Sequence, residues 1–124
     1  METLDQTKTK LPIIPLRGLT VLPGEIMHCD IGRKKTLLAM EQALSADGLA
    51  LLCMQEDQKR AEIDETELYR FGTVCRLRQV FRIRNDAVHL LVTGIARAHI
   101  EEFTAVEPYF EAKVAYLTET EPDA

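Results

Sequence analysis

The sequence lacks the short motifs that would give it catalytic chemistry. Its only serine, Ser45, falls in a predicted helix, and its six glycines are isolated, so no phosphate-binding loop is present. His28 and Cys29 are adjacent, but neighbours on a strand point to opposite faces, which argues against a catalytic dyad. His89 and His99 have no third ligand at metal-binding spacing. We therefore predict no catalytic residue, no metal and no cofactor for this chain.

The sequence also lacks paired cysteines for disulfides, a membrane-spanning segment and a net positive charge. The three cysteines, Cys29, Cys53 and Cys75, are odd in number and widely spaced, which favours buried thiols in a reducing compartment. No segment approaches the ~20 apolar residues that cross a bilayer, and residues 1–10 contain no apolar signal core. We therefore expect a cytoplasmic protein with no membrane partner. The net charge of −5 argues against a nucleic-acid partner, although a local basic face remains compatible with it.

What is present is one domain's worth of ordinary globular sequence, with 124 residues, 46% of them hydrophobic and 28% charged. Residues 33–46 are the one predicted helix, because Leu37, Met40 and Leu44 recur at spacings of three and four. Gly48 follows where a left-handed C-terminal cap is favoured. Short strands are predicted at 25–31 and 49–54. Residues 11–16 contain two prolines and predict an edge strand or a strand with one free side.

From Phe71 onward the apolar period changes to two, which is typical of a strand. One predicted face carries Cys75, Leu77, Gln79, Phe81 and Ile83, and the other carries Arg76, Arg78, Arg82 and Arg84. Asn85 and Asp86 indicate a turn, after which residues 88–95 complete an antiparallel hairpin. Gly94 predicts a bulge or bend, residues 97–103 continue the strand, and residues 110–117 follow the break at Pro108.

These elements predict a mainly β fold with one α-helix, an α+β chain of six or seven strands. So few residues favour a curled, barrel-like sheet with the helix plugging one side. We expect residues 1–10 to be a flexible lead-in, residues 11–117 to be the domain, and residues 118–124 to be an acidic tail.

Two charge patterns break local rules. Arg33, Lys34 and Lys35 open the helix, where cations oppose the macrodipole by roughly 0.3–1 kcal/mol each. They could be kept for a contact, or the penalty could simply be screened by salt. The arginine row of the predicted strand could bind nucleic acid or an acidic peptide. It could equally be a solvated face, or pair with the acidic run at 62–67, which itself is typical of a solvated loop.

Four blocks of sequence, taken in order, resemble the amino-terminal domain of the ATP-dependent protease Lon. They are Leu11-Pro12-Ile13-Ile14-Pro15-Leu16-Arg17 with Val21-Leu22-Pro23, then Ile31-Gly32-Arg33-Lys34-Lys35-Thr36, then Leu68-Tyr69-Arg70-Phe71-Gly72-Thr73-Val74, and finally residues 91–100. His28-Cys29 stands where the family usually has Pro-Leu, and Leu22 stands where an aromatic residue is common.

The resemblance implies a PUA-like pseudo-barrel that precedes a helical subdomain, an AAA+ ATPase and a serine protease domain with a Ser-Lys dyad. The chain stops where the helical part begins in that family, so we expect residues 118–124 to start a linker to it. ATP and Mg²⁺ belong to the resembled parent, a homohexameric hydrolase. The implied role of this domain is non-catalytic: it captures damaged, misfolded or regulatory proteins and supports assembly with other Lon subunits.

Capturing unfolded chains requires accessible apolar surface. We predict a substrate-binding surface that consists of Leu22, Pro23, Ile26, Met27, Arg33, Lys34 and Lys35. The competing interpretation is that the apolar members of this set belong to the core. Two other functions stay open: the domain could serve mainly in oligomerisation of the protease, or it could be an RNA-binding PUA-like module. The acidic net charge argues against RNA.

Overall fold

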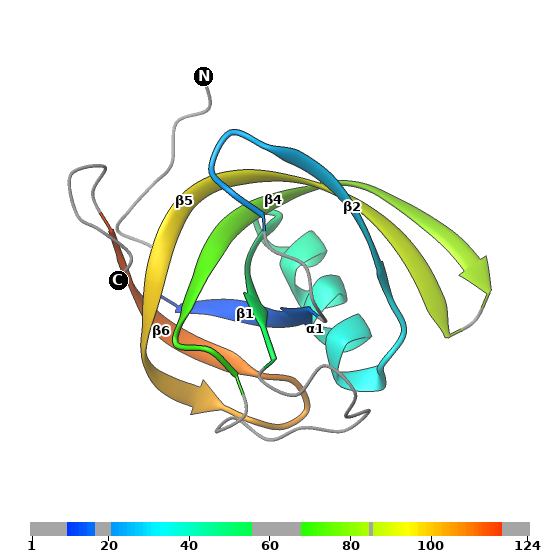
Figure 1. The fold of residues 1–124 in the computed structure, drawn as a ribbon. Helices are drawn as coiled ribbons and strands as arrows, with labels where there is room; N and C mark the ends of the chain where they lie inside the picture. The colour runs from blue at the N-terminus through cyan, green and yellow to red at the C-terminus, as the bar shows by residue number, and fades with distance from the viewer. Residues whose placement is uncertain (1–9, 17–20, 56–67, 85, 118–124) are drawn as a thin grey trace.

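The computed structural model describes residues 10–16, 21–55, 68–84 and 86–117 (Figure 1). Its elements are β1 (Lys10–Leu16), β2 (Ile26–Ile31), α1 (Lys34–Ser45), β3 (Leu49–Met54), β4 (Phe71–Arg84), β5 (Ala87–Ala105) and β6 (Glu111–Tyr116). The predicted acidic tail, the acidic run at 62–67 and all but the last residue of the predicted lead-in lie outside the described residues.

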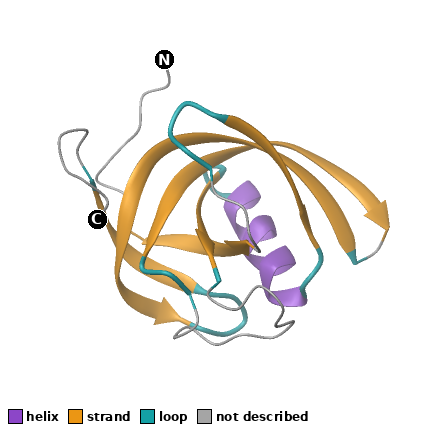
Figure 2. Ribbon diagram, viewed as in Figure 1, coloured by secondary structure: helices purple, strands orange, loops and turns teal. Residues whose placement is uncertain are grey.

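The strands form one sheet in the order β2-β5-β4-β3-β1-β6, and β6 also pairs with β5. Five strands therefore close into a barrel, and β2 is added to the outside edge of β5. Figure 2 shows the strands curving into a rounded sheet, with the helix α1 packed beside them. The predicted mainly β fold with a helix and a curled sheet is thus confirmed, and the described residues contain six strands and one helix.

The prolines of β1 are placed where they interrupt no ladder. The second half of β1 runs parallel to β3, and its first half runs antiparallel to β6. The Ile13 amide donates toward β6, and the Leu16 carbonyl accepts from the β3 side. Alternate residues direct their backbone nitrogens to opposite edges of a strand. The nitrogen of Pro12 therefore faces β3, whose pairing with β1 begins only at Ile13. The nitrogen of Pro15 faces β6, whose pairing with β1 has already ended at Pro12. The predicted edge strand with a free side is wrong, because β1 pairs with β3 on one edge and with β6 on the other. The prolines are tolerated because each lies where its nitrogen is not required to donate to the ladder.

Both faces of the barrel wall are buried, which explains the continuous apolar run of β3. Leu49, Leu51 and Cys53 belong to the cluster inside the barrel, whereas Ala50 and Leu52 belong to a second cluster under the helix. Figure 1 shows α1 under the arch of β4 and β5, with the barrel on one side and β2 on the other. The helix thus covers the outer face of β1 and β3.

A bulge at Gly94 lets the long strand β5 serve both clusters. Val92 and the even-numbered residues before it pack under the helix, whereas Ala98 and Ile100 pack inside the barrel. The β4–β5 register shifts between these two groups, where Cys75 pairs with Gly94 and Ile95 is the extra residue. One extra residue reverses which face the even positions occupy. The predicted bulge at Gly94 is confirmed.

A second bulge, at Arg78, was not predicted and corrects the expected faces of β4. Leu77 pairs with Val92, but Gln79 pairs with Leu91, so the alternation reverses there. Val80 consequently packs against the core under the helix. The predicted apolar face therefore divides: Cys75 and Leu77 are buried, while Gln79, Phe81 and Ile83 are exposed.

The helix begins and ends close to the predicted residues, but its buried face is rotated. Its buried residues are Thr36, Ala39, Met40 and Ala43, while Leu37 is half-buried and Leu44 is exposed. The prediction that Leu44 faces the core is wrong. Gly48 has a φ of 79° and donates its amide to Ala43 O over 2.8 Å, which is the predicted left-handed termination.

Candidate functional site

The turn that precedes β2 is held rigidly against the barrel. Thr73 donates its hydroxyl to the carbonyl of Val21, which is buried. Leu22 N donates to the Glu25 carboxylate over 2.8 Å, and Glu25 N donates back to Leu22 O over 3.0 Å. Gly24 completes the turn with a φ of 88°, a left-handed value that favours glycine. The side chains around this turn therefore point outward from a fixed backbone.

Those side chains are apolar and open to solvent. Leu22 is 49% exposed and Ile26 is 70% exposed, and Pro23 between them is also exposed. Met27 is different, because it is half-buried and packs against the core cluster under the helix. We call Leu22, Pro23 and Ile26 the apolar turn surface. The core interpretation is therefore wrong for these three residues and correct in part for Met27.

More exposed apolar area lies on the same outer face of the sheet, toward the end of β4. Phe81 and Ile83 are 49% and 58% exposed. The register aligns Phe81 with His89 on β5, and His89 with Asp30 on β2. Sequence reasoning missed this area because it assigned both residues to the core face. The exposure of these two residues follows only from the pairing register of β4 with β5, which the bulge at Arg78 shifts.

Two of the predicted cations at the start of α1 contact residues outside the apolar turn surface. Arg33 donates to the amide oxygen of Gln55. Lys35 forms a 2.8 Å ion pair with Glu107, and its ammonium lies 4.6 Å from the ring centre of Phe110. Lys34 is exposed. Two of the three cations thus make structural contacts elsewhere in the chain.

The arginine row is also divided among local partners. Arg76 donates to Asp47 O, Arg78 to the Thr93 hydroxyl, and Arg84 pairs with Asp86. Arg82 lies across the second bulge on the helix side, where it pairs with Glu41 at 3.5 Å. The four guanidinium groups therefore do not form one basic face, which corrects the expected shared face.

The histidine region of the outer face is a chain of hydrogen bonds that sequence spacing did not reveal. His28 Nδ1 and His89 Nε2 are 2.8 Å apart, and His89 Nδ1 is 2.6 Å from the Asp30 carboxylate. Cys29 points inward instead, and burial raises the pKa of its thiol to about 11. His28 and Cys29 therefore occupy opposite faces, as predicted. Among the described residues, no group of three or more His, Cys, Asp or Glu is arranged to hold a metal.

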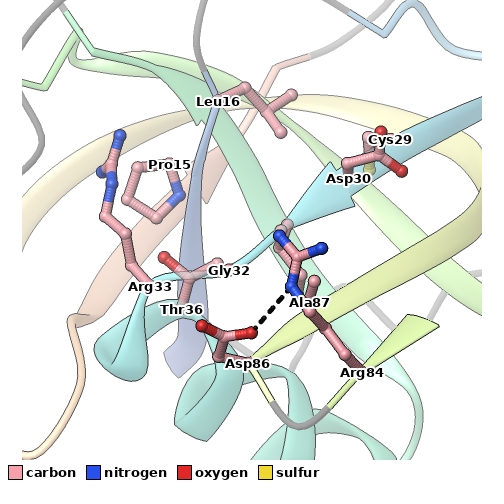
Figure 3. A pocket seen from close by; sticks show the side chains of 11 residues that line it. Pro15, Leu16, Cys29, Asp30, Gly32, Arg33, Thr36, Arg84, Asp86 and Ala87 are labelled. Carbon is pink, nitrogen blue, oxygen red and sulfur yellow. Dashed lines mark hydrogen bonds and ion pairs between the residues drawn. The ribbon is translucent and has the colours of Figure 1, made fainter. Parts of the chain in front are cut away.

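One pocket lies at the start of α1 (Figure 3). Its volume is about 500 Å³. It is lined by Pro15, Leu16, Cys29, Asp30, Ile31, Gly32, Arg33, Thr36, Arg84, Asp86 and Ala87. The other predicted site residues, Leu22, Pro23, Ile26, Met27, Lys34 and Lys35, are not among these. Within the part of the chain that the structure describes, no helix is long and apolar enough to cross a membrane.

Taken together, a small closed β-sheet with one helix, an exposed apolar turn and a side pocket are features of a binding domain. The family model described as "ATP-dependent protease La (LON) substrate-binding domain" matches residues 10–124. The chain therefore belongs to the Lon substrate-binding domain family, as the four sequence blocks predicted.

Curated relatives agree. The chain is 42% identical over 112 residues to Lon protease of Brevibacillus choshinensis and 40% identical over 111 residues to Lon protease of Clostridium acetobutylicum. Each match covers 90% of this chain but only 14% of the relative. The chain thus spans about one seventh of these proteins.

Solved structures show the same fold. The N-terminal domain of Mycobacterium avium complex Lon protease superposes with a TM-score of 0.70 and 22% identity, covering 91% of this chain and 57% of that one. A Lon N-terminal domain protein from Xanthomonas campestris gives a TM-score of 0.66 at 18% identity, covering 94% of this chain and 63% of that one.

Proposed function

We propose that this chain recognises unfolded or damaged polypeptides on behalf of an ATP-dependent serine protease, and that it takes no part in cleavage. The observation that carries the proposal is the apolar turn surface, where Leu22 and Ile26 are exposed although their backbone is held in place. The description of the matching family as a substrate-binding domain supports it. Exposed apolar groups of this kind bind apolar segments that folded proteins keep buried.

The expected contribution of this surface follows from its area. Complete burial of a leucine or isoleucine side chain stabilises a complex by roughly 1.5–3 kcal/mol. Leu22 and Ile26 are already partly covered, so about 1 kcal/mol each is a reasonable contribution. Removing both should therefore weaken binding by at least about tenfold. Met27 is not part of this estimate, because its side chain packs against the core.

The test measures affinity for a reduced, carboxymethylated model protein, which cannot refold. Fluorescence anisotropy compares the natural chain with the double variant Leu22→Ser, Ile26→Ser. Leu44→Ser is the matched control, because Leu44 is an equally exposed leucine on α1. We expect weaker binding in the double variant only. Equal affinity of all three proteins, with native circular dichroism spectra, would contradict the proposal.

Under this proposal the remaining chemistry belongs to other parts of a longer cytoplasmic protein. Those parts would bind ATP and Mg²⁺, contain the AAA+ and Ser-Lys protease units, and form a hexamer in which other Lon subunits are partners of this chain. No nucleic-acid partner is proposed, because the arginines of β4 pair within the chain. The purified chain should accordingly hydrolyse neither ATP nor a fluorogenic peptide.

A further inference from the structure

Within the part of the chain that the structure describes, β2 is the one strand with a single neighbour. It stands at the end of the strand order and pairs only with β5. Every other described strand has two neighbours, because β6 pairs with both β1 and β5. The second edge of β2, which we call its free edge, therefore presents main-chain amides and carbonyls that no described strand uses.

A hydrogen bond next to β2 shows which of its residues face the free edge. Gly94 on β5 donates its amide to Glu25 O over 2.8 Å, so the carbonyl just before β2 points toward β5. Backbone groups alternate in direction along a strand. Ile26, His28 and Asp30 therefore direct their amides and carbonyls to the free edge. The side chains of these three residues are exposed and lie on the outer face of the sheet.

The free edge lacks the features that normally keep an edge strand from pairing with another chain. Such features include lysine or proline on the edge, a bulge, and a very short strand. β2 has six residues, which is an ordinary length, and it contains neither lysine nor proline. Its register with β5 runs without a shift from Ile26 to Ile31. The carboxylate of Asp30 bonds to His89 on β5, which holds it toward the paired side. The edge is therefore suited to accept a further strand.

Space for the side chains of such a strand is present beside β2. The pocket at the start of α1, with its volume of about 500 Å³, reaches the second half of β2. Figure 3 shows Pro15 and Leu16 of β1 across this pocket from Cys29 and Asp30. A side chain placed opposite Cys29 in an added strand points to the same face as Cys29, which is inward. Because Pro15 and Leu16 are apolar, this position favours an apolar side chain.

We propose that an extended segment of the captured polypeptide adds to the free edge of β2 as a further strand. Its main chain forms hydrogen bonds with Ile26, His28 and Asp30, which do not depend on the sequence of the segment. Its inward side chains enter the pocket beside Leu16, so segments with apolar residues at alternate positions bind best. Folded proteins keep such segments paired within their own sheets, so unfolded chains are the ones that offer them. This inference rests on the proposed function and adds a main-chain contact to it.

The first experiment uses a short peptide that alternates valine and threonine between terminal lysines. One version is unmodified, one is N-methylated at every valine, and one is N-methylated at every threonine. N-methylation removes a main-chain donor, as proline does. A strand directs the amides of its valines to one edge and those of its threonines to the other. Only one of the two methylated peptides can therefore still pair with β2, and anisotropy titrations on the natural chain measure all three affinities.

The second experiment changes the free edge itself. His28→Pro removes a donor from this edge, where proline is tolerated because its nitrogen does not face β5. His28→Ala is the matched control, because it removes the same side chain and its contact with His89 but keeps the amide. Far-ultraviolet circular dichroism checks the fold of both variants. If His28→Pro fails to fold, the methylated peptides decide alone.

On the natural chain we expect one methylated peptide to bind at least about tenfold more weakly than the unmodified one, and the other to lose less than about threefold. Methylated threonines are the damaging set if the added strand is antiparallel to β2, and methylated valines if it is parallel. His28→Pro should bind the unmodified peptide several-fold more weakly than His28→Ala does.

Four results would overturn the inference. They are no binding of the unmodified peptide, an equal effect of the two methylations, a folded His28→Pro that binds as well as His28→Ala, and self-association of the natural chain that His28→Pro abolishes. The last would assign the free edge to a second copy of the chain. If the methylations have equal effects while the Leu22, Ile26 double variant still binds the carboxymethylated protein more weakly, the proposed function stands and only this inference fails.

Discussion

Replacing Gly94 by alanine should destabilise the fold and alter the apolar turn surface together. A β-carbon at position 94 would collide with the carbonyl oxygen of Leu22 and lie 3.0 Å from its carbonyl carbon and 3.1 Å from a methyl group of Val21. The obstructing atoms belong mainly to backbone, so they cannot turn away as a flexible side chain does. The turn before β2 must therefore move away from β5.

The cost can be worked from the contacts that this movement breaks. Gly94 donates its amide to Glu25 O over 2.8 Å and accepts from Gly24 N over 2.9 Å. Losing two such hydrogen bonds costs about 1–3 kcal/mol, and crowding a packed site costs a similar amount. We expect Gly94→Ala to lower the free energy of unfolding by about 2–4 kcal/mol, a large part of the 5–15 kcal/mol typical of a domain.

The assay is urea unfolding followed by far-ultraviolet circular dichroism. Gly24→Ala is the control, because Gly24 also lies in the turn but has open space around it, so only its positive φ opposes a side chain. Its cost should be about 1 kcal/mol. Binding of the carboxymethylated model protein should weaken in Gly94→Ala. A change in stability below about 0.5 kcal/mol for Gly94→Ala would refute the argument.

Two further predictions concern the thiols and the start of the helix. Burial raises the pKa of Cys29 to about 11 and those of Cys53 and Cys75 to about 12, above the unfolded value of 9.0. The unfolded thiols ionise first, so the free energy of unfolding should fall as pH rises above 9, by about 1.4 kcal/mol per pH unit for each thiol. Urea titrations at pH 8 and 10.5 measure the fall, which should be smaller in Cys53→Ala; an equal fall would contradict the assignment. Lys35→Ala should cost about 1 kcal/mol, because it removes an ion pair and a cation–π contact. At 1 M salt the loss of stability caused by Lys35→Ala should be smaller, because salt screens the ion pair. If Lys35→Ala leaves the urea unfolding midpoint unchanged at low salt, the contacts of Lys35 do not stabilise the fold.

Local patterns predicted the elements well because each one depends on nearby residues. The helix follows from apolar spacing and ends at Gly48, and the bulge at Gly94 follows from a glycine within a β-rich run. The order of the four sequence blocks predicted the family. What these patterns share is that a short window contains all the necessary information.

The failures arose where pairing between distant strands decides the outcome. The bulge at Arg78 reverses the faces of β4. No glycine or proline near Arg78 indicates a bulge at that position in the sequence. That reversal exposes Phe81 and sends Arg82 toward the helix. Similarly, His28 meets His89 only because β2 pairs with β5. Of the candidate site, the exposure of Leu22 and Ile26 was compatible with the sequence, while the pocket beside Thr36 could not be seen in it.

The pairing of β1 with β6 joins residues about one hundred positions apart, since Lys10 lies opposite Lys113. Closing so long a loop carries a large entropic cost that must be met before the contact contributes anything. Folding kinetics should therefore resemble those of slow all-β domains, on the scale of milliseconds to seconds. During synthesis, the first strand must wait until nearly the whole domain has left the ribosome before it finds its final neighbour.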